Sequence, residues 1–175
     1  MATVLATAFA DDPVVTWLLP ERRRHRAMFT ALVSNVHAAP DCSDVAVDRG
    51  AIVGAALWDP PGHRPGRRHA AVGGLRLACA LGSALRRGVA LESAFARHRP
   101  EEPHWYLAQI GAAAPGRGIG SELLATRLGR IDLPAYLECS SEANLPLYAR
   151  HGFTVIDEVD LPYAGPRVWL MLRRG

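Results

Sequence analysis

The sequence predicts an α/β protein in which a mixed central β-sheet is flanked by helices. Amphipathic stretches with apolar residues three or four positions apart, typical of helices, alternate along the chain with short apolar and aromatic runs, typical of strands. A glycine-rich turn at residues 116–120 follows one such strand and precedes one such helix. A chain of 175 residues is long enough to bury a core of its own. We therefore expect a single domain over residues 1–175.

Two helices are predicted near the N-terminus. Residues 2–9 have the pattern of the end of a helix, and the run Asp11-Asp12-Pro13 ends it. Residues 21–37 predict a second helix with a continuous apolar face. That face comprises Met28, Phe29, Leu32, Val33 and Val36.

The middle of the chain predicts a hairpin and then two more helices. Residues 44–48 and 51–58 predict strands around a turn that contains Gly50. Residues 59–68, rich in Pro, Gly and Arg, predict a loop. Two helical stretches follow, separated by Gly82 and Ser83. They cover residues 70–80 and 84–97.

The C-terminal part alternates strands and helices without a long linker or an internal repeat. Its predicted strands cover residues 104–112, 135–139, 154–161 and 168–172. Its predicted helices cover residues 118–130 and 144–150. This alternation predicts an α/β sandwich with a mixed central sheet.

Composition excludes several classes of protein. The net charge of +3 is too small to indicate a nucleic-acid partner, and all 20 basic residues are arginine. Three widely spaced cysteines favour reduced thiols over a disulfide framework or a metal site. No apolar stretch has membrane-spanning length, and no signal peptide precedes the first helix. We expect a cytoplasmic protein with no nucleic-acid, membrane or metal partner.

The glycine-rich turn predicts an anion site. A helix that begins directly after Gly116, Gly118 and Gly120 presents free backbone N–H groups where the helix dipole is positive, which suits a phosphate or pyrophosphate. A dinucleotide fingerprint is one alternative, with Ser121 at its third glycine position and Glu138 as the acidic residue. However, the residues after this turn are too few for a doubly wound sheet. An ordinary turn without a ligand is the other alternative.

A second motif follows the turn. It runs Asn144-Leu145-Pro146-Leu147-Tyr148 and continues to His151-Gly152-Phe153. Together with the glycine-rich turn, it resembles the GCN5-related N-acetyltransferase (GNAT) superfamily. Residues 8–13, 98–107 and 165–171 also resemble the members of that family that acetylate puromycin. The similarity therefore spans nearly the whole chain.

The resemblance implies a GNAT-type fold and acetyl-CoA as co-substrate. It assigns pyrophosphate binding to the glycine loop, pantetheine binding to Asn144 and to the backbone of the preceding strand, and the role of general acid to Tyr148. Alternatively, Asn144 caps the short helix and Tyr148 only packs its ring on the core. The residues expected to bind the cofactor are Ile110, Gly111, Ala112, Gly116, Arg117, Gly118, Ile119, Gly120, Ser121, Asn144 and Tyr148.

Glu138 is the predicted general base. It ends a strand that points toward the cofactor end of the sheet, where a carboxylate accepts a proton directly or through water. A surface or salt-bridged carboxylate is the alternative. His104 and Glu142 are reserve candidates for the base. His151 ends a helix, where a cationic ring interacts favourably with the dipole, so we expect it to be structural.

The first half of the chain is expected to select the substrate. Trp17 and Trp58 would line the acceptor pocket with Phe9, and Asp12 and Asp59 would attract a cationic amine. Core packing is the alternative for both tryptophans. The predicted reaction is direct transfer of acetyl from acetyl-CoA to a primary amine of a small molecule, for example an antibiotic-like amine. The alternatives are a protein lysine or N-terminal acetyltransferase and a non-catalytic acyl-CoA-binding sensor.

The chain departs from the family pattern in two places. It begins inside the first helix, so the first strand of the family's sheet is missing and an unpaired edge is expected. Either a partner chain, as in a homodimer, covers that edge, or the protein starts upstream. In the glycine loop, Pro115 stands where the family has Gln or Arg, and proline has no N–H for a phosphate.

Overall fold

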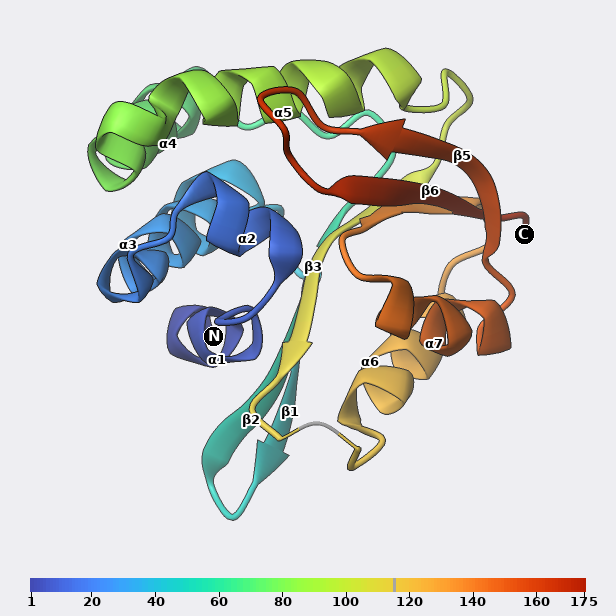
Figure 1. Cartoon of the computed structure of the whole chain (residues 1–175). Coiled ribbons are helices and arrows are strands. Elements are labelled where there is room, and N and C mark those ends of the chain that lie inside the picture. Colours follow the sequence, from blue (N-terminus) through green and yellow to red (C-terminus); the bar gives the residue numbers. More distant parts are fainter. Residues whose placement is uncertain (115) are drawn as a thin grey trace.

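The computed structural model describes residues 1–114 and 116–175, in which six strands form one mixed sheet (Figure 1). The strands are β1 Ser43–Asp48, β2 Ala51–Asp59, β3 Trp105–Ala112, β4 Ala135–Cys139, β5 Thr154–Asp160 and β6 Arg167–Arg173. The α-helices are α1 Ala2–Ala8, α2 Pro13–Leu18, α3 Arg22–Ala31, α4 Arg67–Leu81, α5 Leu85–His98, α6 Ile119–Leu128 and α7 Leu145–Arg150. Short π or 3-10 segments are η1 Leu32–Val36, η2 Gly82–Ala84 and η3 Glu142–Asn144.

These elements confirm the predicted α/β fold with its mixed central sheet. Among the α-helices of the described residues, α2 is the one that the sequence did not predict. Asp12 does end the first helical stretch, but its Oδ1 then accepts hydrogen bonds from the backbone N–H groups of Val14 and Val15, both at 3.0 Å. An aspartate followed by proline at the first helical position is a good helix start, so the same residues both break one helix and begin the next.

The strand order is β1-β2-β3-β4-β6-β5, and only β3 and β4 are parallel. These two strands pair at Trp105 with Ala135 and at Tyr106 with Tyr136, and then separate. Beyond Tyr106, β3 is paired only with β2 among the described residues. One edge of β3 is therefore open in the middle of the sheet.

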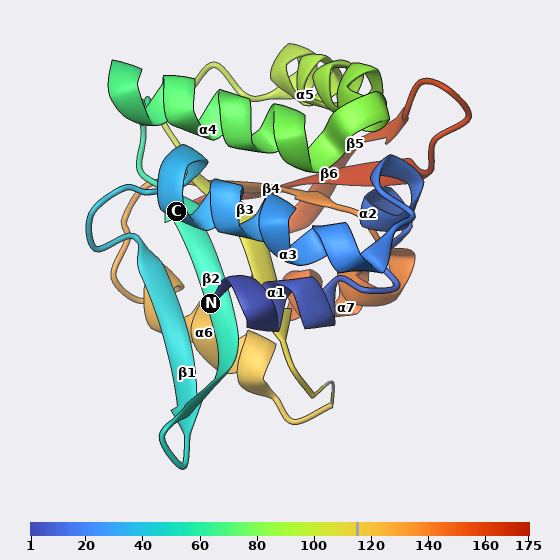
Figure 2. The ribbon, with the colours of Figure 1, turned by 90° about the vertical axis from the view of Figure 1, so that its left-hand side faces the viewer.

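Helices cover both faces of the sheet. One buried cluster lies under α6 and α7 and includes Trp58, Leu124 and Tyr148. Another lies under α1, α3 and α4 and includes Phe29 and Leu57. Figure 2 shows α1, α3 and α4 in front of the sheet. Because successive residues of a strand face opposite sides, Leu57 and Trp58 of β2 belong to different clusters.

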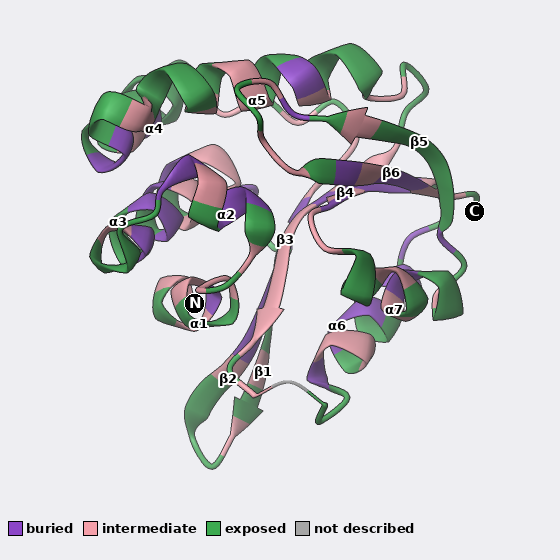
Figure 3. Cartoon of the chain, viewed as in Figure 1, coloured by how far each residue is buried: buried purple, intermediate pink, exposed green. Residues whose placement is uncertain are grey.

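Among the strands, burial is greatest in β2 and β4 and least in the two edge strands (Figure 3). β1 and β5 are the edge strands, and Val45 and Val47 of β1 are exposed. Such an edge offers unpaired backbone groups. Gly111 lets α1 approach β3 closely, because a Cβ there would lie 2.7 Å from the Cβ of Ala8.

No helix of the described chain is long and apolar enough to cross a membrane. Cys42, Cys79 and Cys139 are free thiols.

Candidate active site

The glycine-rich turn forms the start of α6. Gly116 and Gly118 have φ angles of 80° and 76°, which are left-handed conformations that glycine adopts without strain. Gly118 caps α6 without a side-chain hydrogen bond, so the first backbone N–H groups of the helix are free to bind another group. The predicted role of Pro115 lies outside the described residues.

A groove of about 430 Å³ runs from this turn along β3. The structure brings all of the predicted cofactor residues together around it: Ile110, Gly111, Ala112, Gly116, Arg117, Gly118, Ile119, Gly120, Ser121, Asn144 and Tyr148. The sequence analysis missed Arg150, which also lines the groove. A cation in the last turn of a helix has an ordinary explanation in the helix dipole, so its position in the sequence carried no separate signal.

The open edge of β3 also lines the groove. Ala113 donates its backbone N–H to the Val53 carbonyl at 2.8 Å, so Ala113 faces β2. Backbone groups of successive strand residues alternate in direction, and Gly111 therefore faces β2 as well. Ile110 and Ala112 turn their N–H and C=O groups toward the gap between β3 and β4. These are the two residues whose backbone was expected to bind pantetheine.

Tyr148 lies where the groove meets a second cavity. Tyr148 is only 8 % exposed, and its ring packs edge-on against the Phe153 ring, with the two ring centroids 6.1 Å apart. Burial raises the pKa of the Tyr148 hydroxyl most, and the charges of Cys139 and Asp12 raise it further. The phenol is therefore protonated at neutral pH. Its ring packs on the core, as the alternative interpretation held, while the residue still lines both cavities.

Asn144 precedes α7 and lines the same two cavities. Its side chain makes no capping hydrogen bond, so the alternative role as a helix cap is not seen. Opposite it, the Ser140 hydroxyl donates to Oδ2 of Asp12 and ties the end of β4 to the start of α2.

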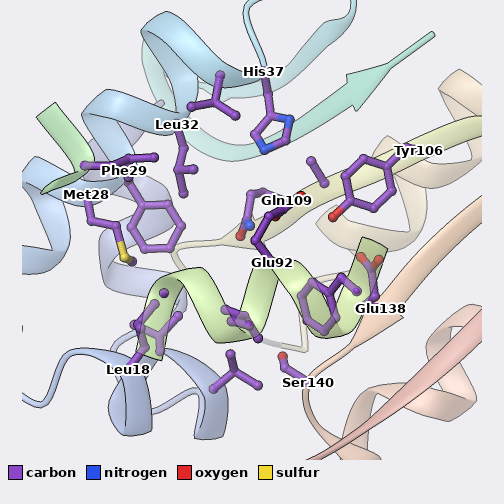
Figure 4. A pocket seen from close by; sticks show the side chains of 18 of the residues that line it. Leu18, Met28, Phe29, Leu32, His37, Glu92, Tyr106, Gln109, Glu138 and Ser140 are labelled. Carbon is purple, nitrogen blue, oxygen red and sulfur yellow. The ribbon is translucent and has the colours of Figure 1, made fainter. Parts of the chain in front are cut away.

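The second cavity has a volume of about 720 Å³ and lies between β3, β4 and helices α2 to α5. Apolar side chains form much of its wall, and Figure 4 shows Leu18, Met28, Phe29 and Leu32 among them. The two cavities share five lining residues. These are Phe9, Asp12, Ile110, Asn144 and Tyr148.

Glu138 lies in the wall of the second cavity. Its side chain is 3 % exposed, with Arg99 Nη2 at 3.7 Å from Oε1. Burial raises the pKa of Glu138 to about 7, against the opposing effects of the Tyr106 hydroxyl, Arg99 and Tyr136. The Arg99 guanidinium also lies 4.4 Å from the centre of the Tyr106 ring. A carboxyl with this pKa exchanges its proton near neutral pH, as a general base must.

The structure corrects the placement of both tryptophans. Trp58 is fully buried in the cluster on the opposite face of the sheet and lines neither cavity. Trp17 packs between α2 and the β5–β6 turn, and its Nε1 donates to the Tyr163 carbonyl at 3.4 Å. For both residues the alternative of core packing applies. The other residues expected at the pocket, Phe9, Asp12 and Asp59, do line it.

The reserve bases do not reach either cavity. The His104 ring packs edge-on against Tyr136, and Glu142 is exposed on η3. His151 Nε2 lies 2.7 Å from the Ser121 hydroxyl, so it joins α7 to the start of α6 in a structural role. Burial lowers the pKa of His151 most, and the charge of Arg150 lowers it further. No group of metal-binding side chains is present among residues 1–114 and 116–175.

The fold agrees with that of known proteins. No family model matches the chain. A histone acetyltransferase HPA2 and related acetyltransferase from Corynebacterium glutamicum is 31% identical, with 99% of this chain and 88% of that chain covered and a TM-score of 0.76. An agmatine N-acetyltransferase shares the fold at 20% identity, with 99% and 92% covered and a TM-score of 0.61. Arylalkylamine N-acetyltransferase 2 from Aedes aegypti does so at 12% identity, with 99% and 93% covered and a TM-score of 0.61.

The chain belongs to the GCN5-related N-acetyltransferase superfamily. It is an N-acetyltransferase, as the glycine-rich turn and the Asn144 to Tyr148 motif predicted.

Proposed function

We propose that this enzyme transfers the acetyl group of acetyl-CoA directly to a primary amine of a small molecule, at the junction of its two cavities. The observation that carries the proposal is the shared lining. The groove that suits the cofactor and the cavity that suits the acceptor meet at Asn144, Tyr148 and three other residues.

The groove has the features that acetyl-CoA requires. Free N–H groups at the start of α6 suit the pyrophosphate, and Arg117 and Arg150 add positive charge beside them. The outward backbone groups of Ile110 and Ala112 suit the amides of the pantetheine arm, as an added strand would. Acetyl-CoA, when bound there, supplies a thioester as the acetyl donor.

The chain's own residues then have three tasks. Glu138 accepts a proton from the amine, since only a neutral amine is nucleophilic. A backbone N–H of β3, at Ile110 or Ala112, stabilises the negative charge that develops on the acetyl oxygen. The Tyr148 hydroxyl donates a proton to the departing sulfur.

A small-molecule acceptor fits this site better than a protein. The acceptor cavity is a pocket of about 720 Å³ between helices and sheet, with a largely apolar wall, whereas a polypeptide needs a long, open groove. Two proteins of the same fold are named for small amines, agmatine and arylalkylamines. The acceptor class that we propose includes antibiotic-like amines such as puromycin. The proposed reaction needs no nucleic-acid or membrane partner.

Replacing Tyr148 with Phe tests the proposal. Because the variant loses the proton donor but keeps the packing on Phe153, kcat should fall by about a hundredfold, while acetyl-CoA affinity changes by less than about twofold. Release of free CoA in the presence of an amine panel measures kcat. Acetyl-CoA titration by calorimetry measures the affinity.

The matched control is Tyr163→Phe, because Tyr163 is 58 % exposed and lies outside both cavities. It should behave like the wild type. An unchanged kcat in Tyr148→Phe contradicts the role of general acid. Acetyl-CoA binding without turnover of any amine by the wild type supports a sensor instead.

A further inference from the structure

A polar cluster that the proposed mechanism does not use lies in the wall of the acceptor cavity. It consists of Asp59, His37 and His63, which all line that cavity. His37 Nδ1 lies 2.7 Å from Asp59 Oδ2, and His63 Nε2 lies 3.8 Å from Asp59 Oδ1. Within the described chain, Asp59 Oδ1 and His63 Nε2 are both buried without a hydrogen-bond partner. Unpaired buried polar atoms are costly, and His63 Nε2 at 3.8 Å lies beyond hydrogen-bond distance, so Asp59 Oδ1 is left to accept from a donor of a bound molecule.

Local structure builds this cluster. Asp59 is the last residue of β2, and His63 follows four residues later in the loop. His37 ends the π-helical turn η1, where its N–H donates to the Leu32 carbonyl at 2.9 Å. The side chains of Asp59 and His37 are only 14 % and 13 % exposed. Their positions are therefore fixed by the fold.

The cluster lies away from the junction of the cavities, where the proposed transfer takes place. Asp59 is opposite Tyr106 in the β2–β3 ladder, and Ile110 at the junction is four residues further along β3. At about 3.3 Å per residue, this places Asp59 about 13 Å from the junction. In Figure 4, His37 and Ser140 lie on opposite sides of the cavity. The Ser140 hydroxyl donates a hydrogen bond to Asp12, which lines the junction, so His37 lies on the side away from it.

The charge around Asp59 favours a cation over a neutral donor. Arg99, the arginine that lines the cavity, is paired with Glu138 instead. Asp12, Glu92 and Glu138 add further carboxyl groups to the same wall. A carboxylate in a poorly hydrated cavity binds an ammonium or guanidinium group more strongly than it binds a hydroxyl.

Building on the proposed function, we propose that Asp59, oriented by His37 and flanked by His63, binds a second cationic group of the acceptor. The acceptor class is then an amine with an apolar body and an amino or guanidino group at its far end. The reacting amine lies at Tyr148, the apolar body contacts Phe29 and its neighbours, and the distal cation fills the gap beside Asp59 Oδ1.

Three acceptors of equal length test this subsite. These are α,ω-diaminooctane, ω-aminooctanol and octylamine, which share the same carbon chain and differ only in the distal group. The required span is roughly 10 Å, which is the spacing of about 13 Å less the length of one hydrogen bond. The wild type should bind diaminooctane at least about tenfold more tightly than octylamine, with aminooctanol closer to octylamine. Calorimetric titration measures binding, and initial rates measure KM and kcat separately.

Asp59→Asn keeps the size of the side chain but removes its charge. It should lose the preference for diaminooctane through KM, with octylamine kcat within about twofold of the wild type. Glu92→Gln, which removes an exposed carboxylate from the same wall, should keep the preference. Melting temperatures check that each variant is folded.

The outcomes separate this proposal from the proposed function. Equal binding of the three acceptors by the wild type overturns the subsite, and this needs no variant. Loss of the preference in Glu92→Gln rather than Asp59→Asn also overturns it. Selective binding of diaminooctane without acetylation supports the subsite and contradicts the transferase reaction. Acetylation of all three acceptors at the same KM supports the transferase and rejects the subsite.

Discussion

Glu138 shows how burial creates a reactive group from an ordinary carboxyl. Its pKa rises from 4.5 to about 7 because burial disfavours the charged form more than the Tyr106 hydroxyl and Arg99 favour it. Burial also raises the pKa values of the Tyr106 and Tyr136 hydroxyls, so both stay protonated and act as donors. The result is a carboxyl that is half ionised near neutral pH, which suits the proposed role of general base.

The wild-type pH profile of kcat/KM should have an inflection near pH 7, since the carboxylate form is the active one. Glu138→Gln should lose this inflection and lower kcat/KM above pH 7 by about a hundredfold. Titration of the free amine substrate affects the wild type and Glu138→Gln equally, so it does not account for a difference between their profiles. Glu101→Gln, an exposed carboxyl outside both cavities, is the control and should keep the wild-type profile. An inflection that persists in Glu138→Gln would show that another group is the base.

The same pKa has a consequence for stability. A carboxyl whose pKa is higher in the folded state binds its proton more tightly there than in the unfolded chain. Folding stability should therefore decline as pH rises from 4.5 to about 7, and Glu138→Gln should lack this decline. Urea denaturation at several pH values, on the same protein samples, measures it.

Side-chain placement was the least predictable level from sequence. Tyr148, Asn144 and Glu138 were found because a motif or a strand end marks them. Trp17 and Trp58 were misplaced, because their side-chain directions depend on the strand register and on packing against the β5–β6 turn. Arg99 and Tyr106 were missed, since they reach Glu138 from different elements.

At the scale of elements, the function proposed for the turn into α6 depends on its backbone. Gly118 is left-handed and leads directly into the free N–H groups of the helix. The sequence predicted this turn well, because strand, glycines and helix are contiguous. The separation of β3 from β4 was not predictable, since it depends on which strands pair and for how long.

Gly118→Ala should weaken acetyl-CoA binding by about tenfold or more, because an alanine costs about 1–2 kcal/mol in this conformation and relaxing it moves the N–H groups. For the wild type, acetyl-CoA at a hundredfold excess over its dissociation constant should stabilise the protein by about 2.7 kcal/mol. Thermal unfolding with and without acetyl-CoA measures both effects.

Gly50→Ala is a matched control for that strain. Gly50 and Gly118 have φ angles of 80° and 76°, and a Cβ at either would meet no atom within 4 Å. Gly50 lies in the β1–β2 turn, outside both cavities, so this variant should lose stability but keep the full acetyl-CoA shift. Equal acetyl-CoA shifts in the two variants would contradict the role given to the α6 turn.

At the scale of the whole molecule, the sheet brings two cavities together. The separation of β3 from β4 exposes the edge of β3 to the groove, and helices α2 to α5 enclose the second cavity. Sequence patterns predicted the order of elements around this sheet but not the acceptor cavity. Its wall combines residues from helices and strands that lie far apart in the sequence, from α2 to α7, and no local pattern encodes such a surface.

The account's central claim is that acetyl-CoA and the amine occupy adjoining cavities at the same time, so that transfer is direct. Initial rates measured with both substrates varied test it most directly, using the best amine of the panel. The shared lining at Tyr148 predicts double-reciprocal lines that intersect, because a ternary complex must form before any product leaves. Parallel lines, with CoA released before the amine binds, would show transfer through an acetylated enzyme and contradict the account.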